Sequence, residues 1–323
     1  MKKGSVLLCF AAAAAGLAAS VAVHAQAWPS KPVRVIVPFG PGGGTDIQGR
    51  LLGKKFFESM RQTFVIENRA GASGLIGAEV IAKSPPDGYN LLFTTASLSV
   101  NVSLYKKIAF DPLKDLQPVS WVSSVPLVLV VHPSVPVKSV KELVALSRQQ
   151  KSGLNAASNG AGTTSHLSLE MLKQFAGANL THIPYKGGGP AMTAMISGEV
   201  DFQFATALAA QPFIKGGKIR PLAVTTLKRS GAFPELPTMA SIYPGFESDN
   251  WYAMFFPAGT PKDIVAKMNG EILSALKAPE IRDFIVKEGG DPVGSTPEEL
   301  SAYFKREVEK YAKIIKAGNI TAA

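Results

Sequence analysis

A short β-branched run, a glycine-rich loop and an amphipathic segment follow one another four times along this chain. The four copies span residues 33–57, 64–83, 153–175 and 180–198. In the first copy, "VRVIVPF" leads into "GPGGGTD" and then into a helix expected from about Ile47 to Phe57. Strands that alternate with helices in this way predict parallel sheets, which places the chain in the α/β class.

Two apolar connections interrupt the series of units. A continuous apolar strand is expected within 121–134, between the second and third units, and another apolar segment, 250–261, follows the fourth. We expect both to cross between two lobes. The last helix carries an apolar face that should pack on the N-terminal lobe; its residues are Leu300, Tyr303, Phe304, Val308, Tyr311 and Ile315. The expected domains are therefore 28–125 plus 246–323, which is discontinuous, and 126–245.

Three sites carry the signal of a capping box, in which Ser or Thr caps a helix and an acid three residues later reaches back. The pairs are Ser139 with Glu142, Thr260 with Asp263, and Thr296 with Glu299. In the last two pairs a proline follows the threonine, as is typical of a first helical turn. We therefore expect a helix to begin at each site.

The N-terminus has the pattern of a secretory signal peptide. Lys2 and Lys3 precede an apolar run, Val6–Val23, and small residues then surround the end of the run. Cleavage is expected after Ala25 or, as the second choice, after Ala27. Residues 1–25 are therefore assigned to export, and the mature protein is expected in the periplasm.

Cysteine content and charge exclude several classes of function. Cys9 is the only cysteine and lies in the leader, so the mature chain can have no disulfide, thiolate metal ligand or cysteine nucleophile. The formal charge of +10 falls to +8 without Lys2 and Lys3. The remaining basic residues are scattered, as in "KREVEKYAK", which is typical of a solvated helix face and not of a nucleic-acid-binding surface.

The glycine loops are candidate anion sites. Where a strand turns through glycine into a helix, unpaired N–H groups and the positive end of the helix dipole point into one small volume. Nucleotide motifs do not match, because Gly42-Gly43-Gly44 is followed by Thr45-Asp46 without lysine, and Thr45 stands where a third fingerprint glycine would be. Asp46 would repel phosphate, and we interpret it as a helix N-cap in preference to a ligand contact.

Catalytic and metal motifs are missing from the sequence. No Gly-x-Ser-x-Gly or His-Glu-x-x-His occurs, and His132, His166 and His182 lack a two-ligand helical spacing. Structural roles are expected for these histidines, with no metal and no cofactor. Among the aromatic residues, Phe39 and the pair Trp251-Tyr252 stand where they could wall a cleft, although core packing is an equally good interpretation.

An ordered set of segments resembles the substrate-binding proteins of tripartite tricarboxylate transporters, the TctC-like or Bug receptors. These segments are "PFGPGGGTD", "ENRAGASGLIG", "PPDGYNLLF", "ASNGAGTTSHL", "HIPYKGGGPAMTAMISGEVDF", "GKIRPLAVTT", "FPELPTM", "PGFE" and "FPAGTP". Together they run over nearly the whole mature chain. Each glycine loop alone would be a weak signal, whereas the ordered set is specific.

The resemblance implies a type II periplasmic binding-protein fold, with two α/β lobes that close on a small organic acid. It also implies a membrane permease pair as partner, no catalysis and no nucleic acid, and we expect a monomer. Carried over residue by residue, the implied ligand-binding positions are Phe39, Gly42, Gly43, Gly44, Thr45, Asp46, Thr94, Ser97, Ser158, Asn159, Gly162, Thr163, Thr164, His166, Gly188, Gly189, Pro190, Ala205 and Thr206.

One position departs from the family pattern. Many relatives have an acid directly after the last phenylalanine of the segment "VDFQF". In this chain that phenylalanine is followed by Ala205 and then Thr206. An acid there could meet an ammonium group, so its absence favours a dicarboxylate, hydroxy acid or aromatic acid over an amino acid. Two alternatives stay open from the residues alone: an exported enzyme that uses His166 as a base, and a ligand-binding partner of a sensory membrane protein.

Overall fold

The computed structural model describes residues 28–105, 107–227, 229–287, 289–317 and 319–321. The expected signal peptide and its cleavage sites lie outside these residues. The strands are β1 (Val33–Val37), β2 (Phe64–Asn68), β3 (Asn90–Thr95), β4 (Leu116–Val131), β5 (Leu154–Ser158), β6 (Leu180–Pro184), β7 (Phe202–Thr206), β8 (Arg220–Val224), β9 (Asp249–Pro257) and β10 (Asp291–Pro292). The helices are α2 (Gly44–Met60), η1 (Ala72–Gly74), α3 (Leu75–Ala82), α4 (Ser97–Leu104), α5 (Val140–Gln149), α6 (Thr164–Ala176), α7 (Gly188–Ser197), α8 (Ala207–Lys215), α9 (Met239–Ile242), α10 (Lys262–Lys277), α11 (Pro279–Lys287) and α12 (Pro297–Ala317).

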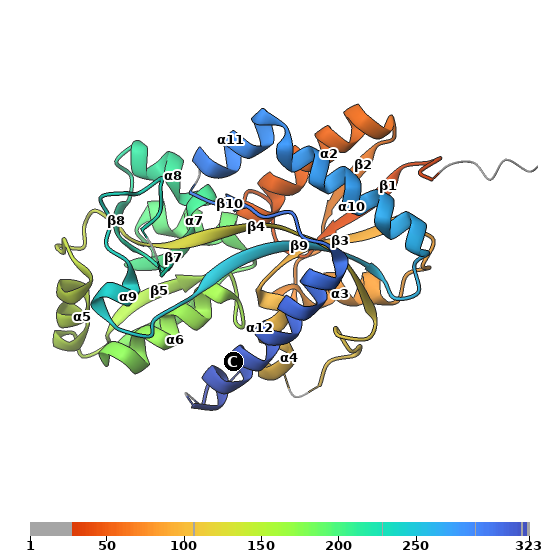
Figure 1. The fold of residues 1–323 in the computed structure, drawn as a ribbon. Coiled ribbons are helices and arrows are strands. Elements are labelled where there is room, and N and C mark those ends of the chain that lie inside the picture. The colour runs from red at the N-terminus through yellow and green to blue at the C-terminus, as the bar shows by residue number, and fades with distance from the viewer. Residues whose placement is uncertain (1–27, 106, 228, 288, 318, 322–323) are drawn as a thin grey trace, which may run out of the picture.

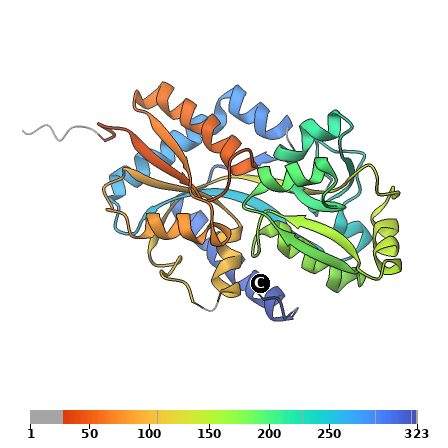
Figure 2. The same cartoon turned by 180° about the vertical axis from the view of Figure 1, so that it is seen from behind.

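The strands form two sheets that share one long strand (Figure 1). The path is β2-β1-β3-β9-β4-β7-β5-β6, with β8 and β10 also paired to β4. Strands of the four repeated units are parallel to their neighbours, as the sequence predicts, whereas β4 and β9 pair antiparallel with the strands beside them. We call the half with β1–β3 lobe 1 and the half with β5–β8 lobe 2; Figure 2 shows them side by side.

The strand β4 connects the lobes. Residues 116–126 pair with β9 in the first sheet, and residues 127–131 pair with β7 in the second. Because β4 changes partner without ending, the sheets meet along a continuous extended segment. The partner change falls at Pro126 and Leu127, within the apolar run in which the sequence predicts a crossing, and β9 runs alongside at Asp249 and Asn250.

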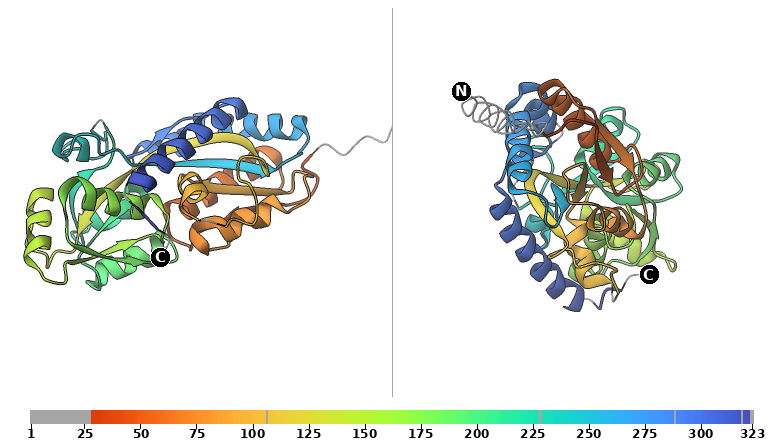
Figure 3. Two further views of the ribbon diagram at one scale, coloured as in Figure 1. Left: turned by 90° about the horizontal axis from the view of Figure 1, so that it is seen from below. Right: turned by 90° about the vertical axis from the view of Figure 1, so that its right-hand side faces the viewer.

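The last helix packs where its apolar face predicts. Leu300 and Phe304 of α12 are buried with Ile36, Leu92 and other residues of lobe 1. Nearer its C-terminal end, Tyr311 is buried with residues of α4 and also with Leu167 of lobe 2. The helix therefore extends from lobe 1 to a contact with lobe 2 (Figure 3).

Of the three expected capping boxes, the one at Thr296 is complete and the one at Ser139 is partial, because its acid accepts from the N–H of Lys138 and not from that of the cap residue. Glu299 N–H donates to Thr296 Oγ1 (3.1 Å) while Thr296 N–H donates to Glu299 Oε2 (2.8 Å). At the start of α5, Glu142 N–H donates to Ser139 Oγ (3.2 Å) and the acid accepts from the N–H of Lys138 (2.7 Å).

The prediction of a capping box at Thr260 is wrong. Pro261 occupies the cap position of α10, and the Thr260 hydroxyl donates instead to the carbonyl of Pro257 (2.8 Å). This hydroxyl therefore closes the turn after β9 and does not cap the helix.

Candidate functional site

Five helices begin around one small chamber between the lobes. Their first residues lie at the carboxyl ends of strands, the usual place for ligands in open α/β sheets. We call this cavity the inner chamber; it is lined by Phe39, Gly43, Gly44, Thr45, Thr95, Ser97, Asn159, Thr163, Thr164, Gly188, Thr206, Asn250 and Tyr252. Ten of the nineteen positions implied by the family resemblance lie in this lining.

The helix α2 begins earlier than expected, at Gly44, and Gly43 is its cap residue. Asp46 is therefore not the N-cap but the third helical residue, where its Oδ2 accepts from Gly42 N–H (3.1 Å) and its Oδ1 from Asn68 Nδ2 (3.0 Å). Burial raises the pKa of Asp46, but these bonds and the Arg50 guanidinium outweigh burial and lower it overall. Asp46 thus fixes the loop as a carboxylate and does not line the chamber.

The two threonines at the start of α6 have different roles. Thr163 is the N-cap: its Oγ1 accepts from His166 N–H (3.4 Å) and donates to Gly160 O (2.7 Å). Thr164 Oγ1 donates to Asn250 Oδ1 (3.0 Å), so it joins lobe 2 to β9. Both line the chamber, but only the Thr163 hydroxyl also satisfies the helix end.

Three expected ligand positions lie behind the loop 159–164 and support it. His166 Nδ1 accepts from Gly162 N–H (3.0 Å), which leaves its proton on Nε2, 3.5 Å from Glu170 Oε1. The His166 ring stacks on His182 with 4.1 Å between centroids, and His182 Nε2 is 2.6 Å from Ser158 Oγ. Ser158, Gly162 and His166 therefore hold the loop and are not part of the lining.

Burial and neighbouring groups determine the protonation states of His182 and Glu170 in the cluster behind this loop. Burial and the neighbouring His166 lower the pKa of His182 to about 3. Burial raises the pKa of Glu170, but hydrogen bonds from His166 and Lys173 dominate and lower it to about 2. A neutral His182 and an ionised Glu170 are therefore the neutral-pH states beneath the loop.

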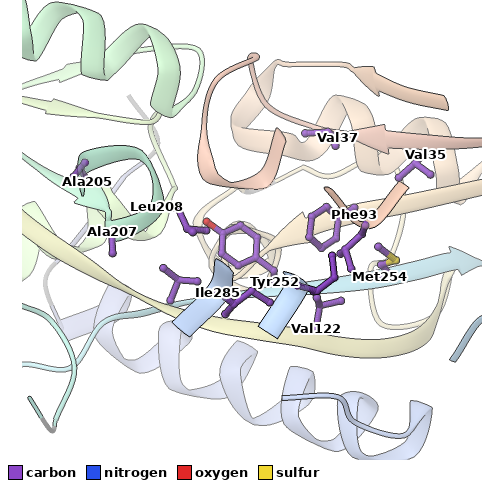
Figure 4. Packing of buried hydrophobic residues seen from close by; sticks show 14 of the residues in the cluster. Val35, Val37, Phe93, Val122, Ala205, Ala207, Leu208, Tyr252, Met254 and Ile285 are labelled. Atoms are coloured by element: carbon purple, nitrogen blue, oxygen red, sulfur yellow. The ribbon is translucent and has the colours of Figure 1, made fainter. Parts of the chain in front are cut away.

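The structure adds three lining residues that the implied set lacks: Thr95, Asn250 and Tyr252. Strand alternation could have found Thr95, since Thr94 and Thr95 point to opposite faces of β3 and only Thr95 reaches the chamber. Tyr252 is fully buried beside Phe93, as Figure 4 shows. Sequence position had marked Tyr252 only as an aromatic that could wall a cleft.

The Tyr252 hydroxyl belongs to a residue of the chamber lining. It forms no hydrogen bond of good geometry within the described part of the chain, although the Asn250 and Thr206 side chains lie beside it and oppose the larger effect of burial on its pKa. Burial raises the pKa of Tyr252, so the phenol is a neutral donor. A side chain at Gly44 would meet this oxygen at 2.4 Å, which explains why glycine stands there. A buried donor without a well-placed acceptor is costly unless something else accepts from it.

Two glycine loops meet across the lobes beside the chamber. Gly40 N–H of lobe 1 donates to Lys186 O of lobe 2 (3.0 Å). A Cβ on Gly189 would lie 2.1 Å from Pro41 O, so only glycine permits this approach. Gly42, Gly189 and Pro190 line a separate hollow outside the contact and do not face the inner chamber. The structure is thus a closed arrangement of the lobes.

Position 205 does not have the role expected of it. Ala205 is 2% exposed and belongs to an apolar cluster, opposite Val128 of β4, while the next residue, Thr206, lines the chamber. An acid at position 205 would enter the apolar core. Its absence is therefore no guide to whether the ligand carries an ammonium group.

The chamber is positive without a charged side chain. Its thirteen lining residues are all neutral. The helices α2, α4, α6 and α7 begin in the lining, and α8 begins directly after the lining residue Thr206. Each helix N-terminus carries roughly half a positive charge and unpaired N–H donors. Among the residues that the structure describes, no group of three or more His, Cys, Asp or Glu could hold a metal ion. These features define a two-lobed solute-binding protein, with a cavity between its lobes that is suited to an anion.

Comparison with known proteins gives the family. A model described as "Tripartite tricarboxylate transporter family receptor" matches residues 49–320. BugT of Bordetella pertussis is 37% identical over 307 residues, which cover 94% of each chain. The chain belongs to this receptor family, as the sequence resemblance predicts, and it is a receptor and not an enzyme.

Solved structures of related proteins support the same family assignment. Rpa4515 of R. palustris, determined with adipate, is 35% identical with a TM-score of 0.88, and the match covers 91% of this chain and 99% of that one. MatC from Rhodopseudomonas palustris, with bound malate, is 30% identical with a TM-score of 0.85, covering 89% and 100%. Receptors of the family are periplasmic. Within the described ranges, no helix has the length and apolar character needed to cross a membrane.

Proposed function

We propose that this receptor holds a carboxylate group of a small organic acid in the inner chamber and passes the acid to a pair of membrane permease subunits. One observation carries the proposal: five helix N-termini and neutral donors from both lobes surround a single small volume. Such a site favours an anion. The adipate and malate in the related structures are organic acids of this kind.

Closure follows from the same arrangement. Thr45 and Thr95 reach the chamber from lobe 1, and Thr163 and Thr206 reach it from lobe 2. A carboxylate can accept from both sets only when the lobes are together, so the acid favours the closed state by its differential contacts. A hydrogen bond to a charged acceptor contributes about 1.5 to 3 kcal/mol, which makes a buried arginine unnecessary.

Several further points belong to the same proposal. The moving bodies are 28–125 plus 246–323 and 126–245, which rotate about β4 and β9. The protein is exported with cleavage after Ala25 or Ala27, works as a monomer, and presents its closed form to the permease.

The test is titration calorimetry with succinate, malate and adipate, each compared with its diamide, on wild type and Tyr252→Phe. We expect an acid to bind while its diamide does not. Loss of the Tyr252 hydroxyl should weaken binding about tenfold or more without lowering stability, because that hydroxyl forms no hydrogen bond of good geometry in the described protein. Equal binding of acid and diamide would refute the carboxylate assignment.

Tyr311→Phe is the matched control. Tyr311 is also fully buried with an unpartnered hydroxyl among the described residues, but it lies on α12 away from the chamber lining. It should therefore leave affinity unchanged. A similar loss of affinity in both variants would assign the effect to general packing and not to ligand contact.

A further inference from the structure

The chain that enters β9 passes from one lobe to the other within the short segment 248–251 (Figure 1). Ser248 Oγ lies 2.9 Å from Ser168 Oγ of lobe 2. Three residues later, Trp251 O accepts from Ala96 N–H of lobe 1 (3.0 Å). Asp249 stands between these two attachments, at the point where β4 changes sheets. A rotation of the lobes must therefore change the backbone at or beside Asp249.

The Asp249 carboxyl is surrounded mainly by other acids. Its Oδ1 is buried and has no hydrogen-bond partner among the residues that the structure describes. Glu247 precedes it in the chain, Glu307 faces it from α12, and Asp291 faces it from β10. Lys310 of α12 favours the ionised form of Asp249, but its Nζ already lies 2.8 Å from Glu307 Oε1. An ionised Asp249 thus adds a negative charge where negative charge already prevails.

Neutral and aromatic groups complete the surroundings of Asp249. Pro126 of β4 stands opposite it in the sheet. Burial raises the pKa of both Tyr303 and Tyr311 on α12, so these phenols are neutral, and the Tyr311 hydroxyl is buried without a partner in the described chain. Arg306 lies over the Tyr303 ring, 5.7 Å from its centroid. The balance of charge at Asp249 therefore depends on Lys310.

The helix α12 connects these surroundings to the position of lobe 2. One turn beyond Glu307, Tyr311 packs in a cluster with Leu167 of lobe 2. We propose that Asp249 is a proton-linked switch at the hinge: the receptor takes up a proton there as the lobes close, so acidification favours the closed, ligand-holding state. Opening separates Leu167 from α12 and admits water to the carboxyl. This inference rests on the proposed function, because the acid is what closes the lobes.

The direction of the effect follows from proton linkage. Burial, followed by the charge of Glu247, raises the pKa of Asp249 to about 6 in the closed structure, whereas a hydrated carboxyl in the open state keeps the ordinary value of 3.8. The contribution of the proton to closure is complete below pH 3.8 and is lost as pH rises through 6. These two values correspond to a roughly tenfold higher affinity at pH 5 than at pH 7.5.

The experiment is titration calorimetry with malate and adipate in pairs of buffers that differ in ionisation enthalpy, which counts the protons taken up on binding. Wild type and Asp249→Asn are compared at pH 5, 6 and 7.5, because their difference removes the protons that the acid itself exchanges. We expect wild type to take up about half a proton more than the variant at pH 6 and almost none more at pH 7.5. Asp249→Asn should match wild type at pH 5 and bind roughly tenfold more tightly at pH 7.5.

Asp283→Asn is the control, because it removes an exposed acid of α11 and should keep the proton uptake of wild type. Wild type alone repeats the test, since its own uptake should fall between pH 6 and 7.5. Equal uptake by wild type and Asp249→Asn, with an affinity ratio that does not change with pH, would refute the switch while the carboxylate receptor stands. If neither acid binds at any pH, the proposed function fails and the switch fails with it.

Discussion

The substitution Gly189→Ala should prevent the two lobes from closing fully without destabilising the fold. In the closed structure the new methyl group would lie 2.1 Å from Pro41 O, whereas contacts below 3.0 Å are essentially never seen. The loops must therefore move apart by roughly 1 Å, which breaks the Gly40 N–H to Lys186 O bond. Such a bond contributes about 0.5–1.5 kcal/mol to the closed state. Donors of the two lobes can then no longer reach one ligand together.

The expected result is a loss of affinity without a loss of stability. Apparent affinity scales with the fraction of protein that can close, so binding of an organic acid should weaken about two- to tenfold. Gly189 is in the first turn of α7, where alanine favours the helix by up to about 1 kcal/mol. The melting temperature should therefore stay the same or rise.

Calorimetry, thermal melting and X-ray scattering test this prediction together. Ligand should reduce the radius of gyration of wild type more than that of Gly189→Ala. Gly270→Ala is the matched control, because Gly270 is also helical but has open space where the methyl group would go. Wild-type affinity and wild-type compaction in Gly189→Ala would show that the glycine contact does not determine closure.

Two more predictions concern stability. Thr163→Val should lower the free energy of unfolding by about 1 kcal/mol in urea titrations, because Thr163 caps α6; an unchanged midpoint would contradict that role. Burial, followed by the charge of Glu247, raises the pKa of Asp249 from 3.8 to about 6, so stability contributed by its protonated form is lost as pH rises from about 4 through 6. Asp249→Asn should therefore gain up to about 3 kcal/mol over wild type at pH 7 but nothing near pH 4. The variant must be compared with wild type at each pH, because the depressed pKa of His182 gives the opposite slope below pH 6.5; a constant difference would refute the prediction.

The sequence alone determined the class of fold and the family. Both follow from local patterns: β-branched runs, glycine-rich turns and capping boxes act within a few residues, and an ordered set of motifs identifies relatives without any knowledge of packing. The same loops also indicated an anion site, because helix N-termini attract anions wherever they occur. Thr296 with Glu299 shows how closely such a local signal can match the structure.

The tertiary structure alone decided which loop residues line the inner chamber. Thr163, in the lining, and His166, behind it, stand three residues apart in the same loop and helix. Tyr252 comes from a strand far along the chain, and its role depends on an oxygen left without a hydrogen bond of good geometry when the lobes meet. The inner chamber exists only between surfaces brought together by folding, so no pattern of neighbouring residues encodes it. Side-chain direction and contact across a cleft are long-range properties, and these decide here which residues line the chamber.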